Sequence, residues 1–162
     1  MARRAPRAVG RAADLVASVA TTGSGAFVCD TGPLVCRLER GAAPGVLRVC
    51  DGLFAAVEEG ALSCLVSAVA VAELLIRPFR AGPVALSLVD RFLRQPALGV
   101  VEVNGAIARE AAYLVAQGRL GRLADALIAA TALDLGLPLV TGDRRLARSG
   151  VVAAFYLGDY AA

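Results

Sequence analysis

Short apolar segments alternate with amphipathic segments along most of this 162-residue sequence. A run of four to eight apolar residues between turn residues is typical of a buried strand. Such runs, some ending on a polar residue, occupy positions 26–30, 62–66, 98–103, 137–141 and 151–155. Because helical segments separate them, the order predicts an α/β fold with a mostly parallel sheet covered by helices on both faces.

The helical segments are marked by apolar residues at three- and four-residue spacing and by residues that favour helix ends. Pro44 suits a first helical turn, Ser67 and Asn104 are natural N-caps, and Gly136 suits the left-handed position that ends a helix. Pro78 is expected to end the helix that contains it. We expect helices at 34–40, from 44 to about 60, and at 68–77, 82–95, 105–117, 123–135 and 144–148.

The length suits one domain with a real core, which we place at residues 25–162. Residues 1–24 are rich in Arg, Ala and Ser, and we interpret them as a flexible basic tail. A secretory signal and an upstream non-structural start are alternative readings of this segment. The tail holds four of the 17 Arg and one of the 14 acids, so from residue 25 the balance is 13 minus 13, or zero.

The chain is 57% hydrophobic, yet its longest uncharged run is 15 residues, from position 15 to 29. A membrane-spanning helix needs about 20 mostly apolar residues, so we expect a soluble, cytoplasmic protein. The four cysteines have no CxxC spacing and the chain has no His, which argues against a zinc site. They lie in apolar runs, as buried free thiols do.

Four acids fall where an α/β sheet gathers ligands. Asp30 ends the first strand, Glu73 lies on the helix after the second, Asp125 opens the helix before the fourth, and Asp143 follows the fourth. The carboxyl ends of parallel strands share one rim, and like charges there resist ionisation unless a cation neutralises them. Carboxylates are the ligands of Mg²⁺ and Mn²⁺, which can activate water for phosphoryl chemistry. The absence of His excludes Ser-His triads and imidazole catalysis.

Each acid also has a purely structural interpretation. Asp125 complements a helix dipole in the first turn, Asp143 suits an N-cap, and Asp30 suits a turn. Glu73 is harder to explain, because its helix is otherwise apolar and a buried unpaired acid is costly. The placement of all four on one rim is what favours a metal site.

Other polar residues flank the proposed site. Thr31 and Thr141 carry hydroxyls near the acids, although both could simply cap turns. Planar guanidinium groups could grip phosphates, although most surface arginines do not. The candidates for substrate binding are Thr31, Thr141, Arg119, Arg122, Arg144 and Arg145.

Three segments resemble the sequence blocks of a known family. FVCDTGPLVCRLER, VSAVAVAELL and ADALIAATALDLGLPLVTGD are similar to blocks of PIN-domain ribonucleases, in particular the VapC-type toxins of toxin–antitoxin pairs. The resemblance covers about residues 26–155, and the last block is its most specific part. The family's four acids fall on Asp30, Glu73, Asp125 and Asp143, and its hydroxyl residue falls on Thr141.

The resemblance implies a three-layer α/β/α sandwich around a parallel sheet of about five strands. It implies a Mg²⁺- or Mn²⁺-dependent endonuclease that cleaves single-stranded or loop RNA and leaves a 5′-phosphate. It also implies a homodimer held inactive by an antitoxin encoded beside it. Rival readings are a housekeeping RNA-processing nuclease and a PIN-like module that only binds RNA or a partner. A phosphoacceptor receiver domain is disfavoured because it needs a Lys, and the chain has none.

Overall fold

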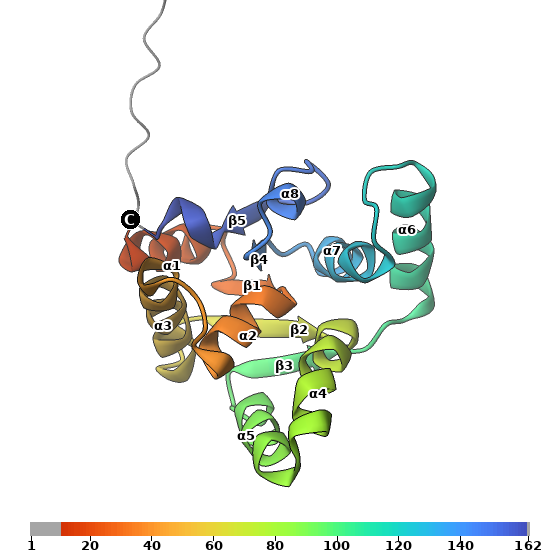
Figure 1. The fold of residues 1–162 in the computed structure, drawn as a ribbon. Helices are drawn as coiled ribbons and strands as arrows, with labels where there is room; N and C mark the ends of the chain where they lie inside the picture. Colours follow the sequence, from red (N-terminus) through yellow and green to blue (C-terminus); the bar gives the residue numbers. More distant parts are fainter. Residues whose placement is uncertain (1–10, 162) are drawn as a thin grey trace, which may run out of the picture.

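Five parallel strands form the centre of the computed structural model, which describes residues 11–161 (Figure 1). Their order across the sheet is β3-β2-β1-β4-β5. Their bounds are Ala26–Cys29 (β1), Ser63–Ser67 (β2), Leu98–Val101 (β3), Leu139–Thr141 (β4) and Ala154–Tyr156 (β5). The predicted fold class, an α/β/α sandwich with a parallel sheet of about five strands, is confirmed.

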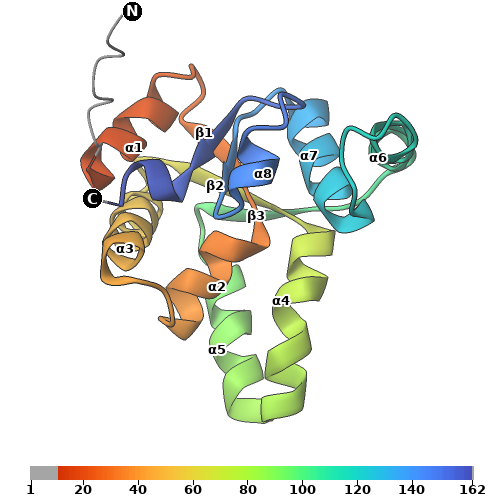
Figure 2. The ribbon, with the colours of Figure 1, turned by 45° about the horizontal axis from the view of Figure 1, so that its top comes forward.

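Helices cover both sides of this sheet. Helices α1 and α3 lie together on one side, and α6 and α7 lie on the opposite side (Figures 1 and 2). Helices α4 and α5 form a hairpin that projects away from the sheet (Figure 2). The α-helices are Ala12–Ala20 (α1), Thr31–Glu39 (α2), Pro44–Glu58 (α3), Ala68–Ala81 (α4), Pro83–Leu93 (α5), Gly105–Ala116 (α6), Leu123–Leu135 (α7) and Arg144–Ala147 (α8). A 3-10 turn, η1, follows at Leu157–Asp159.

The core lies where the central strands meet the helices. Phe27 and Val28 on β1, and Leu139 on β4, are fully buried. Helix α7 packs against β1 and β2 through small side chains, and Ala129 and Ala130 are fully buried. Because Ala removes little side-chain entropy on folding, α7 can approach the sheet closely at low conformational cost.

The order in which successive strands are added to the sheet reverses at β1. From β1 the chain proceeds outward to β2 and β3, and then returns to place β4 on the other side of β1. Such a reversal opens a crevice at the carboxyl ends of the strands, where α/β proteins bind ligands. The first strand ends at Cys29 and the fourth at Thr141, so Asp30 and Asp143 both follow strands that end at this crevice.

Two helices differ from the sequence expectation. Helix α4 does not end before Pro78 but continues to Ala81, with Pro78 buried inside it. A proline inside a helix removes its own N–H from the helical ladder and crowds the carbonyl four residues before it. Packing of α4 against α5 offsets that cost and holds the last turn in place. Helix α2 begins at Thr31 rather than near residue 34, because the carboxylate of Asp30 caps it.

The interpretation of residues 1–24 as a flexible tail is wrong for the part that forms α1. Leu15 and Val19 on this helix are fully buried, and the helix packs against α3. Their four-residue spacing places both on one face, which adds to the core. Residues 1–10 lie outside the described part of the chain. Within residues 11–161, no helix is long and apolar enough to cross a membrane.

Candidate metal centre

Asp30 lies at the junction of β1 and α2 and is 8% exposed. Its Oδ1 accepts a hydrogen bond from the backbone N–H of Thr31 at 2.7 Å, which caps α2. Its Oδ2 accepts a hydrogen bond from the hydroxyl of Thr141 at 2.6 Å. The two bonds fix the orientation of this carboxylate at the floor of the crevice.

Glu73 reaches the same crevice from the second turn of α4. Ser67 caps this helix by accepting from the N–H of Val69. The hydroxyl of Thr31 donates to Glu73 Oε2 at 2.6 Å, so Thr31 contacts both Asp30 and Glu73. Arg122 lies 3.9 Å from Glu73 Oε1 and is 73% exposed, which makes it a long, solvent-screened ion pair.

Asp125 lies in the first turn of α7 and accepts no hydrogen bond from any described residue. Asp143 caps α8 and accepts from the backbone N–H groups of Arg145 and Leu146. The N-cap interpretation of Asp143 is therefore correct. It does not remove Asp143 from the crevice, because a carboxylate has lone pairs for more than two partners.

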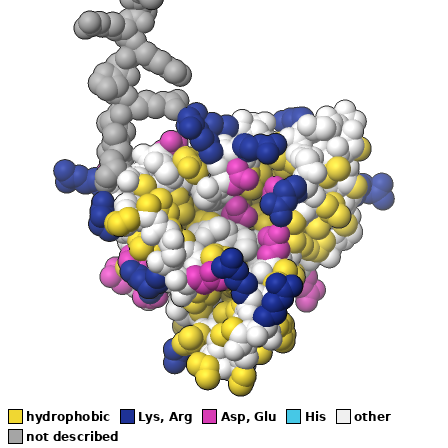
Figure 3. All heavy atoms as spheres, viewed as in Figure 1, with side chains coloured by type: hydrophobic (Ala, Val, Ile, Leu, Met, Phe, Trp, Pro, Cys, Tyr) yellow, Lys and Arg dark blue, Asp and Glu magenta, His cyan; other side chains and the backbone are white. Residues whose placement is uncertain are grey.

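The structure brings all four acids to one open cavity of about 910 Å³. Acidic side chains gather in the middle of this face, with arginines around them (Figure 3). The cavity is lined by Asp30, Thr31, Glu73, Asp125 and Asp143 together with Gly32, Cys36, Ala42, Val46, Arg77, Arg122, Gly142, Arg144 and Leu157.

Burial first, and then repulsion among the acids, raises the pKa of Asp30 and Asp125. Burial raises the pKa of Asp30 above its ordinary value, against the lowering effect of its bonds from Thr141 and Thr31, and the charges of Asp125 and Glu73 raise it further. The pKa of Asp125 is also raised, first by burial and then by the charges of Asp143 and Glu73. Arg122 opposes this second shift. A cation among these carboxylates would relieve the strain.

The oxygen atoms that face the cavity belong to carboxylates and hydroxyls, which are the ligand types that hard divalent cations prefer. In residues 11–161, no three His, Cys, Asp or Glu side chains are close enough together to enclose an ion. A cation here would therefore be held by one or two carboxylates and by water, as Mg²⁺ commonly is.

A family model describing the PIN domain matches residues 49–151, which is more than half of the sequence. This chain belongs to the PIN-domain family. The match includes Glu73, Asp125 and Asp143, whereas Asp30 lies before it and joins them through the fold.

Solved structures share the PIN fold. A chain of VapBC2 from Rickettsia felis bound to a DNA fragment from its promoter matches at a TM-score of 0.63 and 17% identity, covering 81% of this chain and 98% of that one. A toxin–antitoxin complex from Klebsiella pneumoniae gives 0.59 and 17%, covering 81% and 97%. FitAcB from Neisseria gonorrhoeae gives 0.58 and 24%, also covering 81% and 97%. No curated protein matches the sequence of this PIN domain.

The predicted arginines divide into two groups in this PIN domain. Arg122 and Arg144 line the acidic cavity, and Arg145 is close enough to influence Asp125. Arg119 does not line the cavity, and its guanidinium instead donates to the carbonyl of Gly150 at 3.3 Å. Arg77 was not predicted, yet it lines the cavity from α4 and pairs with Glu39 of α2. Only its place one turn after Glu73 could have indicated it.

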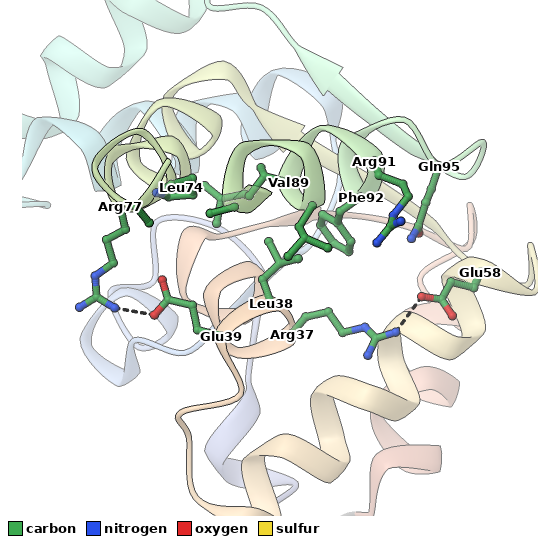
Figure 4. Close-up of a pocket in the computed structure, with 14 residues that line it drawn as sticks. Arg37, Leu38, Glu39, Glu58, Leu74, Arg77, Val89, Arg91, Phe92 and Gln95 are labelled. Carbon is green, nitrogen blue, oxygen red and sulfur yellow. Dashed lines mark hydrogen bonds and ion pairs between the residues drawn. The ribbon is translucent and has the colours of Figure 1, made fainter. Parts of the chain in front are cut away.

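A second hollow of about 460 Å³ lies between α2, α4 and α5, and we call it the apolar groove (Figure 4). Leu38, Leu74, Val89 and Phe92 converge on its floor. Ion pairs close its two sides, joining Arg77 to Glu39 and Arg37 to Glu58 (Figure 4).

Two polar residues lie at one end of the apolar groove (Figure 4). Gln95 Oε1 is buried and has no hydrogen-bond partner. Arg91 pairs with no acid in residues 11–161. A buried acceptor without a donor is costly, so this end of the groove favours a partner that supplies one.

Proposed function

We propose that this PIN domain is a metal-dependent endoribonuclease whose site is formed by Asp30, Glu73, Asp125 and Asp143. The observation that carries the proposal is the meeting of four carboxylates in one cavity, with no buried cationic side chain among residues 11–161 to neutralise them. Such an arrangement is unfavourable for folding alone, as the raised pKa values of Asp30 and Asp125 indicate.

Asp30 and Asp125 would be the primary ligands of a Mg²⁺ or Mn²⁺ ion, with Glu73 and Asp143 completing the shell through bound water. A bound ion would supply an activated water and stabilise negative charge on the phosphate. Thr141 and Thr31 orient the carboxylates through hydroxyl bonds of 2.6 Å each. The chain has no His, and we assign positioning of the attacking water to one of the carboxylates.

The polyanionic substrate would be attracted by arginines around the acids. Arg122 and Arg144 line the cavity, and Arg122 is 73% exposed and free to turn toward a phosphate. Thr31 and Thr141 are committed to the carboxylates, so we assign them positioning roles. Arg145 would contribute to substrate attraction through its charge. Arg119 does not line the cavity and bonds to Gly150, so we assign it no contact with a phosphate bound there.

A cleavage assay with two matched variants tests the nuclease proposal. Asp125→Asn removes one carboxylate from the cavity, and Asp134→Asn makes the same change on the exposed side of the same helix. With Mg²⁺ or Mn²⁺, wild type and Asp134→Asn should cleave RNA, and Asp125→Asn should lose cleavage. Equal cleavage by all three proteins would end the assignment.

The PIN family and the fold shared with chains of toxin–antitoxin complexes support a narrower proposal, a VapC-type toxin restrained by an antitoxin. Growth arrest on expression in a bacterial host, relieved by the gene encoded beside this chain and absent in Asp125→Asn, would support it. A housekeeping nuclease would cleave RNA without causing relievable arrest.

The apolar groove suits the antitoxin as its occupant. An amphipathic helix would fill the floor with apolar side chains, offer a carboxylate to Arg91 and donate an N–H to Gln95 Oε1. Leu88 lines the groove and is 49% exposed, whereas Val84 on the same helix is 77% exposed and outside it. Leu88→Asp should weaken binding of the purified antitoxin and Val84→Asp should not.

We also propose a homodimer. Tyr113 and Leu123 on neighbouring helices are 57% and 59% exposed, and large exposed apolar side chains mark interaction surfaces. Sedimentation should give twice the chain mass of 16.5 kDa. A particle of single-chain mass at micromolar concentration would contradict the dimer.

A further inference from the structure

A hollow of about 330 Å³ adjoins the acidic cavity, and it is formed by α2, the loop before α3, and α4. Gly32, Cys36, Ala42 and Arg77 line both spaces, whereas none of the four acids lines the hollow. The hollow therefore continues the acidic cavity away from the acids. A polymer that places a phosphate at the acids can place the group next to that phosphate in the hollow.

The lining of the hollow is mainly small and apolar. Val35, Cys36 and Ala42 give it apolar walls. Glu39 and Arg77 are the only charged residues within 11–161 that line it. Apolar walls with a few polar groups that fix orientation are typical of sites for small ligands. The composition therefore indicates a site for a compact, partly apolar group that can bond to a carboxylate.

Glu39 is the last residue of α2, and Arg77 of α4 pairs with its Oε2 (Figure 4). Glu39 Oε1 accepts no hydrogen bond from any residue in the described range 11–161. A carboxylate has about four lone-pair sites, so Glu39 can accept further N–H donors while Arg77 stays in place. The side chains of Glu39 and Arg77 are 36% and 74% exposed, and a pair so exposed adds little to stability.

Arg40 anchors the loop that forms one wall of the hollow. It takes the left-handed backbone conformation (φ 55°) at the end of α2. Its guanidinium donates to both carboxylate oxygens of Asp51 on α3, at 2.9 and 3.0 Å. This bidentate pair ties the loop, and with it Ala42, to α3. A wall that is formed before the ligand arrives lowers the entropy cost of binding.

We propose that this hollow binds one base of single-stranded RNA and that Glu39 selects guanine there. The inference rests on the proposed nuclease function, because it takes the phosphate beside that base to lie at the acids. Guanine is the RNA base whose Watson–Crick edge presents two adjacent N–H donors, at N1 and N2, and these match the two oxygens of a carboxylate. Cytosine, adenine and uracil each present a single donor group with an acceptor beside it, which a carboxylate repels. The planar guanidinium of Arg77 suits stacking on the base.

A neutral base suits the hollow better than a cationic side chain of a partner protein. The guanidinium of Arg77 already lies at the wall, and a second positive charge beside it would be repelled. A base carries no charge, and the phosphates on either side of it are attracted by the same guanidinium. Charge therefore favours RNA over an arginine or lysine of a partner.

Fluorescence anisotropy tests the base site without any need for cleavage. The protein is the full chain with Asp125→Asn, in EDTA, so that neither metal nor turnover affects binding. The probes are a labelled uridine hexamer and the same hexamer with one central guanosine or inosine. We expect the guanosine RNA to bind about tenfold more tightly than the uridine RNA or better. Inosine lacks the N2 amino group and should lose most of that gain.

Two glutamate variants on this background act as a matched pair. Glu39→Gln keeps the size of the side chain but replaces one acceptor oxygen with a donor, so the guanosine and uridine RNAs should bind with nearly equal affinity. Glu59→Gln makes the same change at an exposed residue that lines neither space, and it should keep the full preference. Arg77→Met should weaken binding of both RNAs, because it removes the stacking plane and its charge.

Equal affinity of the Asp125→Asn protein for the guanosine and uridine RNAs, or a preference that survives Glu39→Gln, would overturn the proposal. If Glu39→Gln left the preference unchanged and weakened binding of the purified antitoxin, the hollow would belong to that partner and not to a base. Cleavage by the wild type is scored separately. Its absence would count against the nuclease function, and the ratio of RNA affinities would still decide the base site.

Discussion

The hydroxyl of Thr141 donates to Asp30 Oδ2 at 2.6 Å, although the two residues are 111 positions apart in the chain. The same Oγ1 accepts the backbone N–H of Asp143 at 2.9 Å. One buried hydroxyl therefore links the ends of β1 and β4 and positions two of the four acids. Thr141 is fully buried, so both bonds are shielded from water.

We expect Thr141→Val to lower the free energy of unfolding by about 1.5–3 kcal/mol, the usual contribution of a buried hydrogen bond to a charged group. Valine keeps the shape of threonine but cannot donate to Asp30. Thr141→Ser keeps the hydroxyl and should lose less. Urea unfolding of the three proteins in EDTA measures the difference, and equal stability of the Val and Ser variants would contradict the assigned role.

We expect Asp125→Asn to stabilise the metal-free protein by up to about 1 kcal/mol at pH 7, a figure limited by solvent screening at this partly exposed site. Burial, and then the charges of Asp143 and Glu73, disfavour the charge of Asp125, and asparagine removes that charge with little change in shape. Asp134→Asn should have no such effect. Calorimetry in EDTA would give a higher Tm for Asp125→Asn alone, and a lower Tm would argue against repulsion among the acids.

The stability that Asp125→Asn adds to the metal-free protein should depend on pH. The pKa of Asp125 in the folded protein is raised. Ionised Asp125 therefore lowers the free energy of unfolding fully above that pKa, and this loss disappears as pH falls toward the pKa of Asp125 in the unfolded chain. Urea unfolding of wild type and Asp125→Asn between pH 7 and pH 4 should show the difference shrinking. A difference that grows on acidification would have the wrong sign for a carboxylate destabilised by its neighbours.

Leu15→Ala should cost about 2–5 kcal/mol of stability, as removal of a fully buried leucine side chain does. Leu15 on α1 is fully buried, whereas Ala17 on the same helix is exposed. Ala17→Ser is the control and should change stability little. If Leu15→Ala also left stability unchanged, α1 would behave as a tail and not as part of the folded domain.

The sequence predicted most of the fold because its signals are local. Helix α7 has the predicted bounds, Leu123–Leu135, since Gly136 takes the left-handed conformation at its end (φ 64°). The meeting of Asp30 with Asp143 followed from one topological rule, that parallel strands end at a common rim. The buried free cysteines were also predicted correctly.

What escaped prediction depends on contacts between segments far apart in the chain. The burial of α1 could not be inferred, because Leu15 and Val19 make a short apolar pattern that becomes informative only against α3. The bond from Thr31 to Glu73 spans 42 positions and has no local signal. The ion pair of Arg77 with Glu39 and the displacement of Arg119 toward Gly150 depend on side-chain placement in the same way.

Binding of Mn²⁺ tests the central claim most directly, because it requires neither the correct RNA nor a partner. Isothermal titration of wild type, Asp125→Asn and Asp134→Asn compares a cavity carboxylate with an exposed one on the same helix. We predict saturable Mn²⁺ binding to wild type and to Asp134→Asn, with binding lost or weakened at least about tenfold in Asp125→Asn, a difference of about 1.4 kcal/mol. Equal affinity in all three proteins, or no binding to wild type, would contradict a metal site built from these acids.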